Sequence, residues 1–310
     1  MLPAHAQRLV VAGEARVSYE SYAGTVVPHW SGGFLLPMER NGLEAPVIHF
    51  IDETGREGQP WVFAIPNATS ILVDDVAYGP DGRWAVSGRA HDRDGHGGGF
   101  ISWLPANHQS AVTRQTYPYD ALKIAIAPDG TTWTQGIEVV AGNEWVGSDH
   151  GIIRRFDRSG NPIGSYIPRN TLREEAITRG SDQGRFAVNR NRVGWYAAVA
   201  HEYFELSYDG NDVTGPMVYP GVASKGDDDT FITGIALMEN GDVYVSADRY
   251  HPFLSGVYRL DRAARLWTPV SLPTKPDGTP ILTQSMILGG DGTRFALFAG
   301  PRVIYVKPAD

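Results

Sequence analysis

Three features of this sequence predict an all-β fold. A hairpin motif recurs along the chain, in which an alternating apolar run leads into an Asp-Gly or Asn-Gly turn and a second alternating run follows. Successive copies of the turn are separated by about 50 residues, a typical length for one blade of a β-propeller. Very little of the chain has the periodicity of an amphipathic helix. We therefore expect a six-bladed β-propeller of four-stranded antiparallel blades.

The first hairpin of each unit is recognised by its turn, because alternation on both sides of such a turn is the strongest short-range signal for a β-hairpin. Four clear copies begin at Asp75, Lys123, Gly234 and Ser285: DVAYGPDGRWAVSGRAH, KIAIAPDGTTWTQG, GIALMENGDVYVSAD and SMILGGDGTRFALFAG. Two weaker copies are TVVPHWSGGFLLPM and RFAVNRNRVGWYAAVAH. The turns lie near residues 32, 82, 130, 192, 241 and 292. The chain therefore holds six units.

A second hairpin inside most units raises the number of strands in each unit to four. Its copies are VIHFIDETGREGQPWVFAIP, IIRRFDRSGNPIGSYIP, YFELSYDGNDVTGPMVYP and VYRLDRAARLWTPV. We expect one domain over residues 1–310, with blades at about residues 20–68, 69–118, 119–178, 179–224, 225–278, and 279–310 together with 7–19.

The two ends of the chain are expected to share the last blade. That blade lacks a fourth strand after Arg302–Pro308, whereas the N-terminal run QRLVVAGEARVSY (Gln7–Tyr19) is a surplus strand before the first blade. Pairing these two segments would close the ring and remove the exposed edges that a linear array would leave.

One short helix is expected between blades three and four. In NTLREEAITRG, Thr171 and Glu174 have the spacing of a capping box, and Gly180 can end the helix. We expect this insertion to be a surface connection.

The composition excludes several classes of function. A net charge of -8 and a pI near 5.6 argue against nucleic-acid binding, which needs a basic surface. The absence of cysteine excludes disulfides, thiolate zinc sites and a cysteine nucleophile. No apolar run is long enough to span a membrane. We expect a monomer whose partner is a small molecule, a carbohydrate or a protein.

The N-terminal residues bear on the location of the protein. Ala4-His5-Ala6 has the small-x-small pattern that precedes a signal-peptidase cleavage site, which favours an exported protein of bacterial type, secreted or periplasmic. An ordinary N-terminal tail fits the same residues equally well.

The segments TGIALMENGDVYVSAD and RRFDRSGNPIGSY resemble NHL repeats. The resemblance covers four blades better than the other two, and it implies a propeller more than an activity, since relatives include binding modules, lyases and metal-dependent hydrolases. The chain is also distantly similar to gluconolactonase-like propellers, which implies a metal held at the axis by acidic and amide side chains. It departs from them where Thr233-Gly234 stands in place of their Asn-Gly.

In a propeller, the start of each innermost strand and the turn between the second and third strands point to one face. Acidic and amide residues at the predicted strand starts are the candidate ligand-binding residues, namely Asp74, Asp75, Asp120, Asp228, Asp229 and Gln284. Histidines near the turns are the candidate metal ligands, namely His91, His150, His201 and His251. Imidazoles and carboxylates on one face suit a divalent metal, with Ca²⁺, Mg²⁺ and Zn²⁺ all open. No catalytic residue is identified.

Two functions remain open at this stage. The first is a ligand- or protein-binding module acting through the acidic, histidine-containing face. The alternative is a metal-dependent hydrolase or lyase with its site at the central channel. A structural role for the same residues is also open, since Asp is a common turn residue. The spacing Asp92-x-Asp94-Gly95 likewise begins a calcium-loop pattern but also suits an ordinary hairpin.

Overall fold

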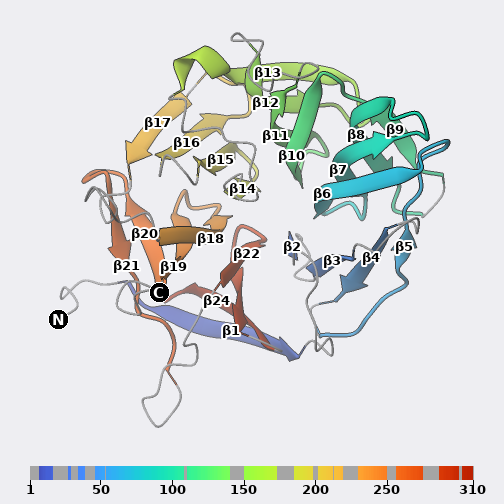
Figure 1. Cartoon of the computed structure of the whole chain (residues 1–310). Coiled ribbons are helices and arrows are strands. Elements are labelled where there is room, and N and C mark those ends of the chain that lie inside the picture. Colours follow the sequence, from blue (N-terminus) through green and yellow to red (C-terminus); the bar gives the residue numbers. More distant parts are fainter. Residues whose placement is uncertain are drawn as a thin grey trace.

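The described residues form six antiparallel sheets of four strands each, arranged around a common centre as the blades of a propeller (Figure 1). The predicted all-β, six-bladed fold is therefore confirmed. The structure is a computed structural model. It describes residues 7–16, 27–28, 34–38, 46–52, 54–107, 110–139, 150–172, 185–197, 202–211, 213–218, 230–249, 256–274, 286–299 and 302–309.

The strands of each blade are lettered A to D, from the centre to the perimeter. Blade one contains β2 (Val27–Pro28), β3 (Phe34–Met38), β4 (Val47–Ile51) and β5 (Trp61–Val62). Blade two contains β6 (Ser70–Tyr78), β7 (Trp84–His91), β8 (Gly97–Leu104) and β9 (Val112–Gln115). Blade three contains β10 (Tyr119–Ile126), β11 (Thr132–Glu138), β12 (Gly151–Phe156) and β13 (Pro162–Pro168).

The second half of the chain repeats the arrangement. Blade four contains β14 (Arg185–Val188), β15 (Arg192–Ala197), β16 (Glu202–Ser207) and β17 (Val213–Val218). Blade five contains β18 (Thr230–Leu237), β19 (Val243–Arg249), β20 (Gly256–Asp261) and β21 (Leu266–Pro269). Blade six contains β22 (Met286–Gly290), β23 (Phe295–Ala299), β24 (Arg302–Pro308) and, as its outermost strand, β1 (Leu9–Arg16).

The A strands contact one another in turn around the centre. β6 contacts β2 and β10, β14 contacts β10 and β18, and β22 contacts β18 and β2. Apolar side chains fill the space between neighbouring blades. Trp133 of blade three and Trp195 of blade four, for example, lie in one buried cluster. Burial of these large rings is a main source of the free energy that holds the blades together.

The N-terminal strand pairs with the last strand of the chain, as the sequence predicts. β1 runs antiparallel to β24, from the pair Leu9–Pro308 to the pair Arg16–Arg302. Near one end of this pair, Arg302 binds both carboxylate oxygens of Glu14, at 2.6 and 2.8 Å. The first and last described segments thus belong to one sheet.

The A strands of four blades carry an irregularity, which lies at the same position relative to the A–B turn in blades two, three and five but closer to that turn in blade six. The pairing with strand B shifts at Asp74 in β6, at Leu122 in β10, at Thr233 in β18 and at Leu288 in β22. Such a bulge inserts one unpaired residue and increases the local twist. In blade two the bulge decides where two candidate site residues lie.

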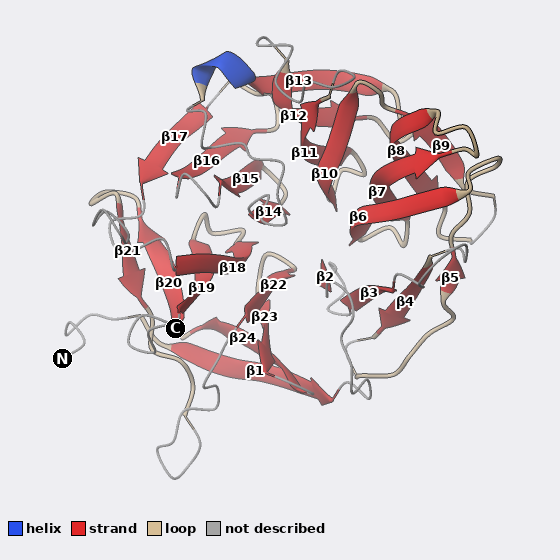
Figure 2. Ribbon diagram, in the orientation of Figure 1, coloured by secondary structure: helices blue, strands red, loops and turns tan. Residues whose placement is uncertain are grey.

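The helix expected after Thr171 does not begin there. The chain forms a short 3₁₀ helix, η1 (Arg169–Thr171), and Leu172 is already extended, with φ -104° and ψ 150°. The Thr171 hydroxyl donates to the carbonyl oxygen of Pro168 instead of capping a following helix. Residues 173–184 lie outside the described part. Figure 2 shows η1 as the one helical element among the described strands, and no described helix is long and apolar enough to cross a bilayer.

Candidate functional site

Two faces of the propeller are distinguished by their turns. In blade two, Ser70 at the start of strand A pairs with His91 at the end of strand B. The A-strand starts and the B–C turns therefore share one face, which is called the B–C face. The opposite face carries the A–B and C–D turns and is called the A–B face. Sequence reasoning placed all its candidate residues on the B–C face.

The structure corrects the position of Asp74 and Asp75. Both lie in the middle of β6, at the bulge, and not at its start. Asp75 is buried, and its Oδ2 accepts a hydrogen bond from the backbone N–H of Ile124 on β10 at 2.9 Å. Asp74 forms an ion pair with Arg89 of β7 at 3.1 Å. Both carboxylates therefore have structural partners, and their role in ligand binding stays a prediction.

Burial raises the pKa of Asp75 above its ordinary value, although Lys123, the N–H groups of Ile124 and Val76, and Arg185 act in the opposite direction. A buried carboxylate is costly to ionise unless it is well paired. Its main contact joins blade two to blade three, so Asp75 acts first as a link between two A strands.

Asp120 lies where the sequence places it, as the second residue of β10. It is buried against the start of β8, where a Cβ added to Gly99 would come within 2.6 Å of Asp120 Oδ1. The glycine-rich start of β8 therefore gives the neighbouring blade room to approach.

His91 and His150 both lie at the B–C face. His91 is the last residue of β7, and its backbone carbonyl accepts the N–H of Thr69. His150 directly precedes β12, and its side chain is only 4% exposed. His150 Nε2 accepts the backbone N–H of Glu138 at 3.2 Å, so the imidazole holds the two ends of the B–C connection together.

A network around Glu138 was not predicted. Its carboxylate binds the guanidinium of Arg154, which lies over the ring of Tyr119 at 3.9 Å from the ring centroid. Burial raises the pKa of the Tyr119 phenol, whose oxygen also contacts the hydroxyl of Thr134 at 3.0 Å. These side chains come from three strands of one sheet and are far apart in the sequence, so the sequence gives no sign that they lie together.

The remaining predicted residues cannot be placed. Outside the described residues lie Asp228, Asp229, Gln284, His201 and His251.

Within the described residues, one group of acidic and histidine side chains could hold a metal ion. Asp92, Asp94 and His96 form it in the B–C turn of blade two, with their ligand atoms within 4.8 Å of one another. His96 is 82% exposed, and its Nδ1 lies 3.6 Å from Asp92 Oδ2. The sequence identified Asp92 and Asp94 but missed His96. The nominated His91 and His150 do not belong to this group.

The same turn geometry occurs three times within the described residues. Asp92 Oδ1 accepts the N–H groups of Asp94 and His96, both at 2.9 Å. In the C–D turn of blade three, Asp157 Oδ1 accepts those of Ser159 and Asn161 at 2.8 Å. In blade one, Asp52 does the same for the third and fifth residues of its turn.

The fourth residue of each turn is a glycine with positive φ: 86° at Gly55, 81° at Gly95 and 79° at Gly160. The aspartate and the glycine therefore build the turn. The third and fifth residues donate their backbone N–H groups to the aspartate, and their side chains take no part in these two hydrogen bonds.

Comparison with known proteins supports the fold alone. No family model matches the chain, and no curated protein matches its sequence. The chain is similar to the PQQ-bound aldose sugar dehydrogenase from Streptomyces coelicolor (TM-score 0.50, 15% identity, 100% of both chains). It is also similar to a luciferin-regenerating enzyme (TM-score 0.51, 14% identity, 95% of each chain). The WD40 domain of Neurospora crassa Pan2 aligns with a TM-score of 0.47 and 7% identity over 100% of this chain and 98% of that one.

Proposed function

We propose that this chain is a binding propeller that engages a polar ligand, or a polar patch on a protein, through the B–C turn of blade two. Asp94 and His96 are the residues that would contact the ligand, directly or through a divalent cation. Imidazole and carboxylate groups suit either mode of binding.

One observation carries the proposal. The turn at residues 92–96 has the hydrogen bonds of the turn at 157–161, yet it places an acid and an imidazole where that turn has Ser159 and Asn161. Because the turn at residues 157–161 forms with other side chains at these two positions, the fold of the turn does not require an acid and an imidazole there. Both are exposed and therefore accessible to a ligand.

The alternative, a metal-dependent hydrolase or lyase at the central channel, has less support. Asp75, a candidate ligand-binding residue at a predicted A-strand start, is buried and bound to the N–H of Ile124. Export and a monomeric state stay predictions from the sequence.

The chain itself supplies the test variant. Asp94→Ser with His96→Asn changes DRDGH to DRSGN, which is identical to residues 157–161, so the turn is expected to fold normally. Thermal shifts would be measured for both proteins with Ca²⁺, Mg²⁺, Zn²⁺ and a panel of soluble mono- and oligosaccharides, because a ligand that binds only the native state raises Tm. We expect at least one of these compounds to raise the Tm of the native chain and not of the variant. Equal shifts in both proteins, or none in either, would contradict the proposal.

A further inference from the structure

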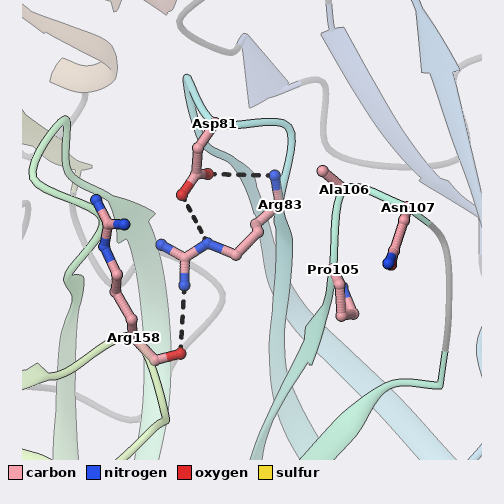
Figure 3. Close-up of a pocket in the computed structure, with 6 residues that line it drawn as sticks. All are labelled: Asp81, Arg83, Pro105, Ala106, Asn107 and Arg158. Atoms are coloured by element: carbon pink, nitrogen blue, oxygen red, sulfur yellow. Dashed lines mark hydrogen bonds and ion pairs between the residues drawn. The ribbon is translucent and has the colours of Figure 1, made fainter.

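A pocket on the A–B face lies between blades two and three, away from the turn discussed above. It is lined by Asp81, Arg83, Pro105, Ala106, Asn107 and Arg158, and its volume is about 420 Å³. Figure 3 shows Asp81 and Arg83 between Arg158 on one side and the turn at residues 105–107 on the other. We propose that this pocket binds the carboxylate of a small organic acid.

Arg83 is fixed in place by three groups. Its Nε binds Asp81 Oδ2 at 2.7 Å, and its Nη1 and Nη2 donate to the carbonyl oxygens of Arg158 and Gly130. The side chain is 15% exposed, so its guanidinium forms part of the wall. Because every nitrogen is engaged, Arg83 contributes mainly a positive field, which Asp81 balances.

Arg158 is held differently. Its Nε and Nη2 both donate to the carbonyl oxygen of Asp129, at 3.2 and 3.0 Å. Its guanidinium packs against Gly130, where an added Cβ would come within 2.3 Å of the Arg158 Nε. These contacts use the Nε–Nη2 edge of the planar group and leave the edge formed by Nη1 and Nη2 without a partner among the described residues, and Arg158 is exposed.

The carboxylates near Arg158 are committed elsewhere. Asp129 Oδ2 binds Arg155 at 2.7 Å, and Asp157 binds the N–H groups and side-chain amide of its own turn. Within the described part of the chain, no carboxylate lies within ion-pair distance of Arg158. The lining thus holds two guanidinium groups and one carboxylate, a net positive site on a chain whose net charge is -8.

The chemistry of the lining indicates the class of ligand. An open guanidinium edge matches a carboxylate in geometry, with two parallel N–H···O bonds. A single surplus positive charge suits a monoanion better than a dianion. Pro105 and Ala106 add an apolar wall, which favours an acid with a short hydrocarbon chain.

Sodium butyrate is the probe for the test, with acetate, sulfate and chloride at equal ionic strength. Binding would be followed by the side-chain Nε–H resonances of arginine in the native chain, in Arg158→Gln and in Arg190→Gln. Arg190 is the matched control, because its side chain is 69% exposed and pairs with Glu239 at a distance from the pocket. Asp94→Ser with His96→Asn is a second control for the opposite face.

We expect butyrate to bind saturably to the native chain and to both control proteins, more tightly than acetate or sulfate. Arg158→Gln should weaken binding by about tenfold or more, the effect of losing hydrogen bonds to a charged group. Three results would overturn the proposal: butyrate acting no differently from chloride, equal losses in Arg158→Gln and Arg190→Gln, or sulfate binding at least as tightly as butyrate. None of these results affects the proposed function of the B–C turn at residues 92–96.

Discussion

The carboxylate of Asp75 on β6 accepts the backbone N–H of Ile124 on β10 at 2.9 Å. This bond joins the innermost strands of blades two and three through a buried side chain. Because the A strands define the centre of the propeller, Asp75 is a sensitive point for testing how neighbouring blades are coupled.

Two substitutions of Asp75 separate its hydrogen bond from its charge. Asp75→Ala leaves the N–H of Ile124 buried without its acceptor and should reduce the free energy of unfolding by about 1–3 kcal/mol. Asp75→Asn keeps an acceptor oxygen and removes the buried charge, so it should be close to the native chain or more stable at neutral pH. Urea unfolding of the three proteins measures these differences.

The pH dependence of the same comparison follows from the raised pKa of Asp75. Below the ordinary pKa of 3.8, Asp75 is protonated in both the folded and unfolded chains, and its contribution to stability is fully present. As the pH rises through the raised pKa of the folded chain, this contribution is lost, because Asp75 ionises at a lower pH in the unfolded chain than in the folded one. The stability of the native chain relative to Asp75→Asn should therefore fall from acidic to neutral pH. If the difference in stability between the native chain and Asp75→Asn is constant with pH, the pKa of Asp75 is not raised in the folded chain and the prediction is wrong.

Glu205 provides a second buried charge, which links blades four and five. Its side chain is 0% exposed and binds Arg192 and Arg262, each at 2.8 Å. Glu205→Ala removes the anion that binds these two part-exposed arginines and the acceptor of the buried Tyr203 hydroxyl, so the free energy of unfolding should fall by about 1–3 kcal/mol. The control is Glu14→Ala at the exposed Glu14–Arg302 pair, where we expect a loss below about 1 kcal/mol. Equal losses in the two variants would show that burial does not matter here.

The B–C turn of blade two should depend on the carboxylate of Asp92 and not on the side chains of Asp94 and His96. The N–H of His96, followed by that of Asp94, lowers the pKa of the Asp92 carboxyl. The contribution of Asp92 to the turn is therefore present above the ordinary pKa of 3.8 and is lost as the pH falls through the lowered folded value. Hydrogen exchange of the Asp94 and His96 amides should become faster in Asp92→Ala. It should stay slow in Asp94→Ser with His96→Asn, and faster exchange in that variant would contradict the role given to Asp92.

The hairpins could be predicted from sequence because their turns depend on local chemistry. Turns such as residues 157–161 need only an aspartate and a glycine at fixed positions, and both are visible in the sequence. The predicted pairing of the N-terminal strand with the last one rested on the strand count in each unit.

The start of the A strand in blade two could not be predicted because of the bulge in β6. The recurring motif was read from Asp75, Lys123 and Gly234, and each of these is the first paired residue after a bulge. An extra residue shifts the alternation by one position, so the first half of the strand does not continue the pattern. Asp74 and Asp75 were therefore placed at a strand end when they lie inside β6.

The candidate site could be predicted only in part. Asp92 and Asp94 were visible as a spacing, whereas His96 becomes informative only when DRDGH is compared with DRSGN at residues 157–161. The contacts of Asp75 with Ile124 and of Glu205 with Arg262 cross between blades, and sequence separations of 49 and 57 residues give no local signal for them.

The backbone amide spectrum of the native chain tests the proposed binding turn most directly, because the protein contains its own control. On addition of a cation or saccharide that raises the Tm, we expect the amide resonances of Asp94, Gly95 and His96 to move while those of Ser159, Gly160 and Asn161 stay in place. Equal movement of the two turns, or movement of neither, would contradict the account.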